Sequence, residues 1–394
     1  MNKRTINTLH LFENYLPNAQ NWIFRTLVNL PNSRIAVAAY HYYNPNFVTP
    51  NIKLIDLPGY VSKDILEGHG SDKPILQWVT DELINKKDCN NKFFKYLAGK
   101  VKELKIDLIH CHFAHVGYQF LELKKLTGLP YIVSFYGFDY ESLVHKYPKW
   151  RNRYKELYDT ANVFICEGAY GAAIIQKQGC PGKKIKVMAL GVDTDNIPLT
   201  NRIKNNNELH LLQLANFKQK KGHIYSLRAF ADAVKDCPDM SITFVGSGVP
   251  EGLTEEVKKY KIADKVKLIS SIPFSELYKF MDSFQVFIHP SCYAEDRDCE
   301  GGAPIVILDA ECTGMPVIAT THCDIPAEVI DGETGFLTPE KDVERLASSI
   351  RHFYKMNNKE YQKFSAAARN HIIDKFNIKK TAAGLEKIYR EILN

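Results

Sequence analysis

Short apolar runs rich in β-branched residues alternate with longer amphipathic segments along the chain. In the first half the short runs occupy residues 5–12, 33–40, 107–114, 130–137, 162–168 and 184–192. In the second half they occupy residues 209–217, 241–248, 265–272, 284–291 and 315–321. Strands that alternate with helices predict parallel sheets covered by helices on both faces. The expected fold class is therefore α/β.

A polar, asparagine-rich stretch, NIPLTNRIKNNNEL, separates the two series at residues 196–209. We interpret it as a linker between two doubly wound, Rossmann-like domains, which we place at residues 1–198 and 199–376. A last helix is expected near residues 377–394, packed back on the first domain. Doubly wound sheets bind ligands at the C-terminal ends of their strands, so we expect a site in the cleft between the domains.

Length and composition support this division. A chain of 394 residues with 45% hydrophobic and 24% charged residues is typical of a globular protein with two domains. The net charge of +6 is mild for this length, so no nucleic-acid partner is expected. An anionic substrate or an acidic membrane surface is sufficient to explain the positive excess.

Nine scattered cysteines without a Cys-x-x-Cys pair predict reduced thiols in a cytoplasmic protein and argue against structural zinc. The first residues lack the apolar core of a signal peptide, and no stretch approaches the roughly 20 apolar residues of a spanning helix. Residues 85–105 and 144–158 mix basic and aromatic residues. They are either solvated helix faces or a surface that contacts anionic lipid at the inner face of the membrane.

The stretch CEGGAPIVILDAECTG, at residues 299–314, places acids around a glycine-rich loop and inside an apolar run. Glycines let the backbone approach a ligand, and the amides at a helix start bind anions, so a phosphate can lie over Gly301–Pro304. Glu300 precedes the loop, and Asp309 lies about one and a half turns into the expected helix. The alternative is a helix start whose acids only complement the dipole.

Three further clusters end strands of the same sheets. The stretch ANFKQKKGH carries Lys218, Lys220 and Lys221 after the first strand of the second half, where lysines can neutralise a diphosphate or simply remain solvated. A weaker signal is the turn GSG at residues 246–248.

The stretch DLIHCHFAHVG places histidines on and just after a strand of the first half. His110 and His112 point to one face of that strand, and His115 lies three residues further on. Without a cysteine or acid spaced to complete a zinc site, packed or ligand-facing histidines are the expected roles. The turn SFYGFDY brings Tyr136 or Asp139 toward the cleft.

Taken in order, these segments resemble the family 4 glycosyltransferases of the GT-B fold. The resemblance spans nearly the whole chain: HCHFAHVG, TGLPYIVSFYGFD and KIKVMALGVD, then KKG, FVGSG, VFIHPS, EGGAPIVILDAECTGMPVIAT and EVIDGETGFLTP. The opening YLPNAQNWIF resembles a subgroup that acts in the synthesis of bacterial surface polysaccharides. The signature that begins at Glu300 is the most specific part.

The resemblance implies transfer of a sugar, with retention, from a nucleotide-sugar donor to a glycan or lipid-linked acceptor, without a cofactor or bound metal. It places Glu300 on the donor sugar, Asp309 on the ribose and Lys221 on the diphosphate. The residues expected in catalysis are Glu300, Lys221, His112 and Tyr136. The residues expected to bind the donor are Asp309, Asn216, Lys218, Gly301, Gly302, Ala303, Ser247 and Asp139.

Three features depart from the family pattern. Eight residues separate Glu300 from Asp309, where seven and a second glutamate are usual, so the added residue falls within 301–303. Asn216 replaces an arginine and loses its charge, for which Lys218 or Lys220 can compensate. Tyr136 replaces a histidine, and His112 or His115 can supply an imidazole instead. Glu311 has no counterpart in the family and is expected to be solvated or paired.

Two other functions remain open. A nucleotide-sugar epimerase can share this architecture, and the changes at Asn216 and Tyr136 also fit a non-catalytic nucleotide or glycan binder. A dehydrogenase that uses NAD is disfavoured, because no G-x-G-x-x-G follows the first strand.

Overall fold

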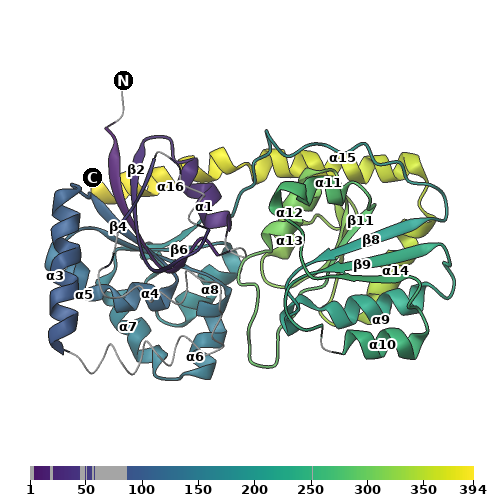
Figure 1. The fold of residues 1–394 in the computed structure, drawn as a ribbon, viewed down its shortest axis with the longest axis horizontal. Helices are drawn as coiled ribbons and strands as arrows, with labels where there is room; N and C mark the ends of the chain where they lie inside the picture. Colours follow the sequence, from purple (N-terminus) through teal and green to yellow (C-terminus); the bar gives the residue numbers. More distant parts are fainter. Residues whose placement is uncertain are drawn as a thin grey trace.

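In the computed structural model, residues 4–17, 21–44, 49, 51–55, 57, 87–250 and 252–394 are described. They form two α/β halves, each built on one parallel sheet, and the halves lie next to each other (Figure 1). The α/β class expected from the alternating pattern is confirmed. Among the described residues, no helix is both long and apolar enough to cross a bilayer.

The first sheet has seven strands in the order β3-β2-β1-β4-β5-β6-β7. Their bounds are β1 (Ile6–Tyr15), β2 (Ser33–Tyr42), β3 (Ile52–Leu54), β4 (Leu108–His112), β5 (Tyr131–Phe135), β6 (Val163–Cys166) and β7 (Ile185–Val187). All neighbouring strands pair in parallel. The register of β1 with β4 sets His10 beside His110, which brings histidines from two strands together.

The second sheet repeats this order with six strands, β10-β9-β8-β11-β12-β13. Their bounds are β8 (Leu209–Leu214), β9 (Met240–Val245), β10 (Val266–Ile269), β11 (Val286–His289), β12 (Val317–Thr320) and β13 (Gly335–Thr338). In both sheets the strand order reverses beside the first strand, and this is where doubly wound folds bind ligands.

Helices cover both faces of each sheet. In the first half they are α1 (Asn21–Val28), α3 (Lys87–Glu103), α4 (Ala114–Gln119), α5 (Leu121–Thr127), α6 (Leu143–Lys146), α7 (Trp150–Thr160) and α8 (Ala169–Lys177). In the second half they are α9 (His223–Ala233), α10 (Leu253–Tyr260), α11 (Leu277–Met281), α12 (Ile305–Cys312), α13 (Ile325–Glu328), α14 (Val343–Lys355) and α15 (Asn358–Lys375).

The last helix, α16 (Ile378–Leu393), returns to the first half and runs along the top of it in Figure 1. Its apolar side, including Leu385 and Tyr389, is buried in the same core as α1 and the first sheet. The Glu386 carboxylate also accepts the backbone N–H of Asn32 at 2.9 Å. The chain therefore ends against its own beginning and crosses twice between the halves.

The asparagine-rich stretch that separates the strand series is not a free linker. Arg202 is 3% exposed, and its guanidinium donates to the carbonyls of Phe284 at 2.8 Å and Thr313 at 2.6 Å. These bonds fix the stretch to the second half. The predicted boundary at residue 198 falls just before this anchor, and the one at residue 376 falls between α15 and α16.

Candidate active site

Turns at the C-terminal ends of the strands of both sheets meet between the halves. The turn after β5 contains Gly137, whose carbonyl accepts the Cys299 thiol of the second half at 3.7 Å. A Cβ atom added to Gly301 would lie 2.3 Å from the Gly137 Cα. Only two glycines permit this approach, so the glycine-rich loop of residues 300–304 is seated directly on the first half.

The glycine-rich loop has the backbone geometry that its sequence requires. Gly301 has a φ of +82°, a conformation that favours glycine, and Pro304 precedes α12 as its first cap residue. The helix start predicted near Pro304 is confirmed. The loop therefore points the first amides of α12 toward the region between the halves, where an anion can bind.

Glu300 is held by three groups of the second half. Its carboxylate accepts the Lys221 ammonium at 2.7 Å and the Ser291 hydroxyl at 2.7 Å, and His289 lies 3.9 Å away. Burial opposes ionisation, but the charge of Lys221, helped by the nearby His289 ring, lowers the pKa of Glu300 well below its usual range. Glu300 is therefore a buried, paired carboxylate.

The three lysines predicted near the diphosphate have different surroundings. Lys221 is paired with Glu300, and burial lowers its pKa. Lys220 donates to the Asp298 carboxylate at 3.1 Å and to the Cys299 carbonyl at 2.8 Å, so it anchors the glycine-rich loop. Lys218 is exposed. Of the three, Lys221 is therefore the lysine that binds Glu300, the first acid of the family signature.

Asn216 and Ser247 lie side by side on the turns after β8 and β9. The Ser247 hydroxyl donates to the Asn216 side-chain oxygen at 2.8 Å. The Asn216 amide N–H groups make no hydrogen bond to another described residue. Asn216 therefore keeps donor capacity at the position where the family pattern has an arginine.

The Asp309 carboxylate of the second half is hydrogen-bonded by a residue of the first half. Arg25 of α1 donates two hydrogen bonds to its carboxylate, at 3.0 and 3.4 Å, and the Tyr278 hydroxyl donates a third at 3.0 Å. The Arg25 guanidinium also lies 4.9 Å from the centre of the Phe274 ring. The carboxylate predicted for the ribose is therefore part of a contact between the halves.

Glu311 departs from its expected surroundings. It is fully buried, and neither carboxyl oxygen has a hydrogen-bond partner that meets geometric criteria among the described residues. Burial raises the pKa of Glu311 well above its usual range. The expectation of a solvated or paired acid is wrong, because α12 is buried along residues 307–312 and Glu311 lies within this stretch.

The histidines of β4 join a hydrogen-bonded cluster that also contains His10 of β1. Nδ1 of His10 lies 3.0 Å from Nε2 of His112, whose Nδ1 lies 2.9 Å from the Tyr136 hydroxyl. His110 bonds the hydroxyls of Tyr389 at 2.7 Å and Ser134 at 2.8 Å. His112 and Tyr136, both predicted in the site, are therefore connected directly.

The three histidines of this cluster are also close enough together to share a metal ion. Ring nitrogens of His10, His110 and His112 lie within 4.8 Å of one another. Burial lowers the pKa of His110 to about 3 and also lowers those of the other two, so the rings are neutral. All their nitrogens are already hydrogen-bonded, and His110 and His112 stack with centroids 4.4 Å apart. The cluster is a hydrogen-bond network in this conformation.

Asp139 supports the turn that carries Tyr136. Its carboxylate accepts the Tyr136 backbone N–H at 3.0 Å and lies 3.7 Å from His115, which contacts Glu13 at 2.9 Å on the other side. Asp139 has no exposed surface. Its side chain therefore faces the interior of the first half rather than the cleft.

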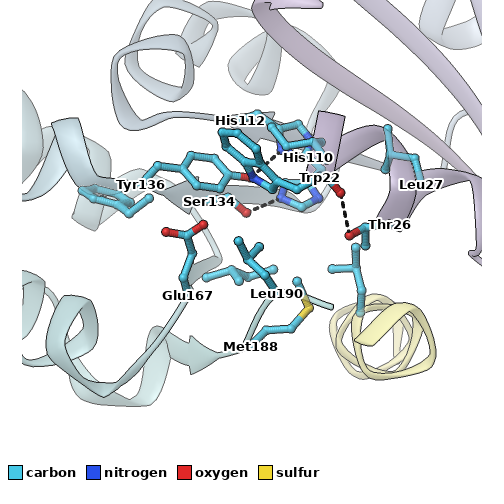
Figure 2. Close-up of a pocket in the computed structure, with 14 residues that line it drawn as sticks. Trp22, Thr26, Leu27, His110, His112, Ser134, Tyr136, Glu167, Met188 and Leu190 are labelled. Carbon is cyan, nitrogen blue, oxygen red and sulfur yellow. Dashed lines mark hydrogen bonds between the residues drawn. The ribbon is translucent and has the colours of Figure 1, made fainter. Parts of the chain in front are cut away.

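A narrow cavity lies beside this cluster (Figure 2). Its lining includes His110, His112, Ser134, Tyr136 and Glu167. Apolar walls come from Trp22, Ile23, Leu27, Ile165, Met188, Leu190 and Leu385. The volume of about 20 Å³ holds roughly one water molecule, so a sugar does not fit the cavity in this conformation.

Two residues of the cleft, Arg25 and Glu167, were not predicted from the sequence. Arg25 could not be found, because its partner Asp309 lies 284 positions away and no pattern connects them. Glu167 follows β6 at the sheet edge that carries Tyr136, and that position in NVFICEG was the available signal. The roles assigned to the predicted site residues remain predictions.

Two family models match the chain, one to each half. The model described as Glycosyltransferase Family 4 matches residues 83–196, and the model described as Glycosyl transferases group 1 matches residues 200–371. The matches cover the glycine-rich loop, the histidines of β4 and the turn of Tyr136.

Curated relatives agree with these models. The putative colanic acid biosynthesis glycosyltransferase WcaL of Escherichia coli (strain K12) is 26% identical over 301 residues, which are 74% of this chain and 72% of the relative. The amylovoran biosynthesis glycosyltransferase AmsK of Erwinia amylovora is 27% identical over 258 residues, 64% of this chain and 63% of that protein.

Solved structures share the fold. Anabaena Alr3699/HepE in complex with UDP and glucose superposes with a TM-score of 0.74 at 13% identity, over 98% of this chain and 100% of that one. WaaG, a glycosyltransferase involved in lipopolysaccharide biosynthesis, superposes with a TM-score of 0.66 at 16% identity, over 96% and 99% of the two chains. Both halves of the chain thus match family models of glycosyltransferases, and the chain has the GT-B fold that its resemblance to family 4 implies.

Proposed function

We propose that this protein transfers a sugar from a nucleotide-sugar donor to a glycan or lipid-linked acceptor during the synthesis of a surface polysaccharide. The observation that supports this most is the buried Lys221–Glu300 pair, placed at the glycine-rich loop where the two halves touch. Relatives named for colanic acid and amylovoran biosynthesis, and a fold neighbour that holds UDP and glucose, favour this substrate class.

The transfer proceeds with retention in this proposal. The bond from the anomeric carbon to the diphosphate breaks while the acceptor oxygen forms its bond from the same side, and the hydroxyl proton passes to a phosphate oxygen. Lys221 and the first amides of α12 stabilise the negative charge that grows on the diphosphate, which is commonly the largest catalytic contribution. Glu300 holds hydroxyls of the donor sugar, and Asp309 holds the ribose after Arg25 moves aside.

No bound metal is needed in this scheme, because the lysine and the amides supply the positive potential. Treatment with EDTA should therefore leave the transfer rate unchanged. A rate that falls with EDTA and returns with a divalent cation would assign the charge stabilisation to a metal instead.

A two-step experiment tests the function. A thermal-shift screen of nucleotide sugars identifies the donor, and transfer to sugar and lipid-linked acceptors is then followed by mass spectrometry. We expect product only when donor and acceptor are both present. Turnover of the donor to an epimer without an acceptor would instead show an epimerase. Binding without transfer or hydrolysis would show a non-catalytic protein.

A further inference from the structure

Glu167 is a carboxyl group in the cleft without an assigned role. It directly follows β6, at the sheet edge where β5 delivers Tyr136, and it lines the same cavity. In Figure 2 its carboxyl group points toward Tyr136 and Ser134. Among the described residues, it makes no hydrogen bond that would give it a structural function.

The second half reaches Glu167 through the glycine-rich loop. A Cβ atom added to Gly302 would lie 2.6 Å from the Glu167 Cβ and 2.8 Å from its Oε2. Gly302 belongs to the loop on which the diphosphate and the donor sugar are expected. Glu167 is therefore the acid of the first half that lies against the donor loop of the second.

In a retaining transfer, the acceptor hydroxyl must lie between the donor loop and the first half, which is where Glu167 lies. The acceptor oxygen must approach the anomeric carbon on the face from which the diphosphate leaves, between the donor loop and the first half. We propose that Glu167 is an acceptor-binding residue whose carboxyl group hydrogen-bonds the attacking sugar hydroxyl and orients it toward the donor. This inference rests on the sugar transfer proposed above.

The charges around Glu167 favour a neutral carboxyl group. Burial and the nearby acids Asp324 and Glu300 raise its pKa well above the usual range, whereas Lys220 opposes them. Lys220 and Lys221 are each already paired with an acid. A bound diphosphate would add further negative charge and keep the proton on Glu167. A neutral carboxyl group both donates and accepts a hydrogen bond, as an amide does.

Because a neutral carboxyl group donates and accepts a hydrogen bond, two variants can test its role. Glu167→Gln keeps the shape, one donor and one acceptor, whereas Glu167→Met keeps the length and removes both. Transfer is measured with the nucleotide sugar found in the screen and a panel of p-nitrophenyl hexosides as probe acceptors, and donor affinity is measured by calorimetry. Glu122→Gln, on the exposed surface of α5, is the control.

We expect Glu167→Gln to keep the acceptor KM within about threefold of the native value. Glu167→Met should raise the acceptor KM by about tenfold or more, as loss of a hydrogen bond does, while donor affinity and thermal stability stay unchanged. An unchanged acceptor KM in Glu167→Met would overturn the proposal. So would equal damage in both variants, or a parallel loss of donor affinity. Absence of transfer by the native protein would instead refute the proposed function.

Discussion

At the residue scale, the cleft is organised by buried pairs of opposite charge. Glu300 pairs with Lys221 on one side of the glycine-rich loop, and Asp309 pairs with Arg25 across the two halves. Buried charges are tolerated only with partners, so each of these groups depends on the other member of its pair. Removal of one member should therefore lower both the free energy of unfolding and the rate of sugar transfer. The two effects can be measured separately.

Glu300→Gln tests the signature acid. The amide cannot balance the Lys221 charge, so we expect the unfolding free energy to fall by about 1–3 kcal/mol. Transfer should fall by about a hundredfold or more, because the donor sugar loses a charged partner. Urea unfolding and transfer rates measure the two effects. Glu276→Gln, an exposed acid of the same half, should change neither. Full activity in Glu300→Gln would remove this residue from the site.

His115 gives a pH-dependent contribution to stability. Burial alone would lower its pKa, but the nearby carboxylate of Asp139 and the hydrogen-bonded carboxylate of Glu13 outweigh burial and raise the pKa to about 10. Because this exceeds the unfolded value of about 6.5, the stabilisation is complete below pH 6.5 and is lost as the pH rises toward 10.

His115→Gln should remove that dependence. Urea unfolding of both proteins between pH 6.5 and 9.5 should show their difference in free energy shrinking by up to about 1.4 kcal/mol per pH unit. A difference that stays constant over this range would show that His115 is neutral in the folded protein.

Contacts between residues of recognisable motifs could be predicted from the sequence. Contacts that form only because the two halves pack together could not. Lys221 and Glu300 lie in the loops that follow two recognisable strands, β8 and β11, so their meeting in the cleft follows from the topology. Arg25 reaches Asp309 only because the two halves pack in one particular orientation. No local pattern in the sequence encodes that orientation.

At the element scale, the glycine-rich loop is the feature on which the two halves meet. Its place after β11 and before α12 follows from the strand and helix periods, as do eleven of the strands. The sequence missed β3 and β13, since each has only three or four residues and no continuous apolar run. Short edge strands are defined by their neighbours more than by their own pattern.

Gly301→Ala tests the contact between the halves. The new methyl group would lie 2.3 Å from the Gly137 Cα, and alanine disfavours the φ of +82°. Gly252→Ala is the matched control, because Gly252 has a φ of +72° but open space around it. The positive φ alone should cost each variant about 1 kcal/mol of stability, and Gly301→Ala should lose more because its methyl group meets backbone atoms.

Only Gly301→Ala should also lose transfer, by about tenfold or more, because its loop can no longer rest on the first half. Equal transfer rates in the two variants would show that this close approach is not part of the active conformation.

At the scale of the whole molecule, two halves share one cleft and are joined by the long helices α15 and α16. The basic and aromatic segment at residues 144–158 lies on the first half. Its aromatic residues Trp150, Tyr154 and Tyr158 are buried, whereas Lys149 and Arg151 are exposed. In the other basic segment, residues 85 and 86 lie outside the described residues, and α3 buries Phe93 and Phe94. These buried aromatic residues belong to the core, and Tyr96 and Tyr147 pack against it while partly buried. The exposed cations are therefore the groups left to contact lipid.

Vesicle flotation tests that contact. If Lys149 and Arg151, the exposed cations at the start of α7, bind anionic lipid, the Lys149→Glu/Arg151→Glu variant should bind phosphatidylglycerol vesicles about thirtyfold more weakly or worse. Each lost cation contributes roughly 1 kcal/mol. Lys258→Glu/Lys259→Glu, on exposed residues of α10, is the matched control and should bind as the native protein does. No preference of the native protein for anionic over neutral vesicles would refute membrane contact.

The central claim is that the cleft transfers a sugar with retention from a nucleotide-sugar donor. Proton NMR of the product, recorded as it forms, measures this most directly, since the coupling constant of the anomeric proton reports the configuration. We predict that product and donor share one anomeric configuration. An inverted product would contradict it.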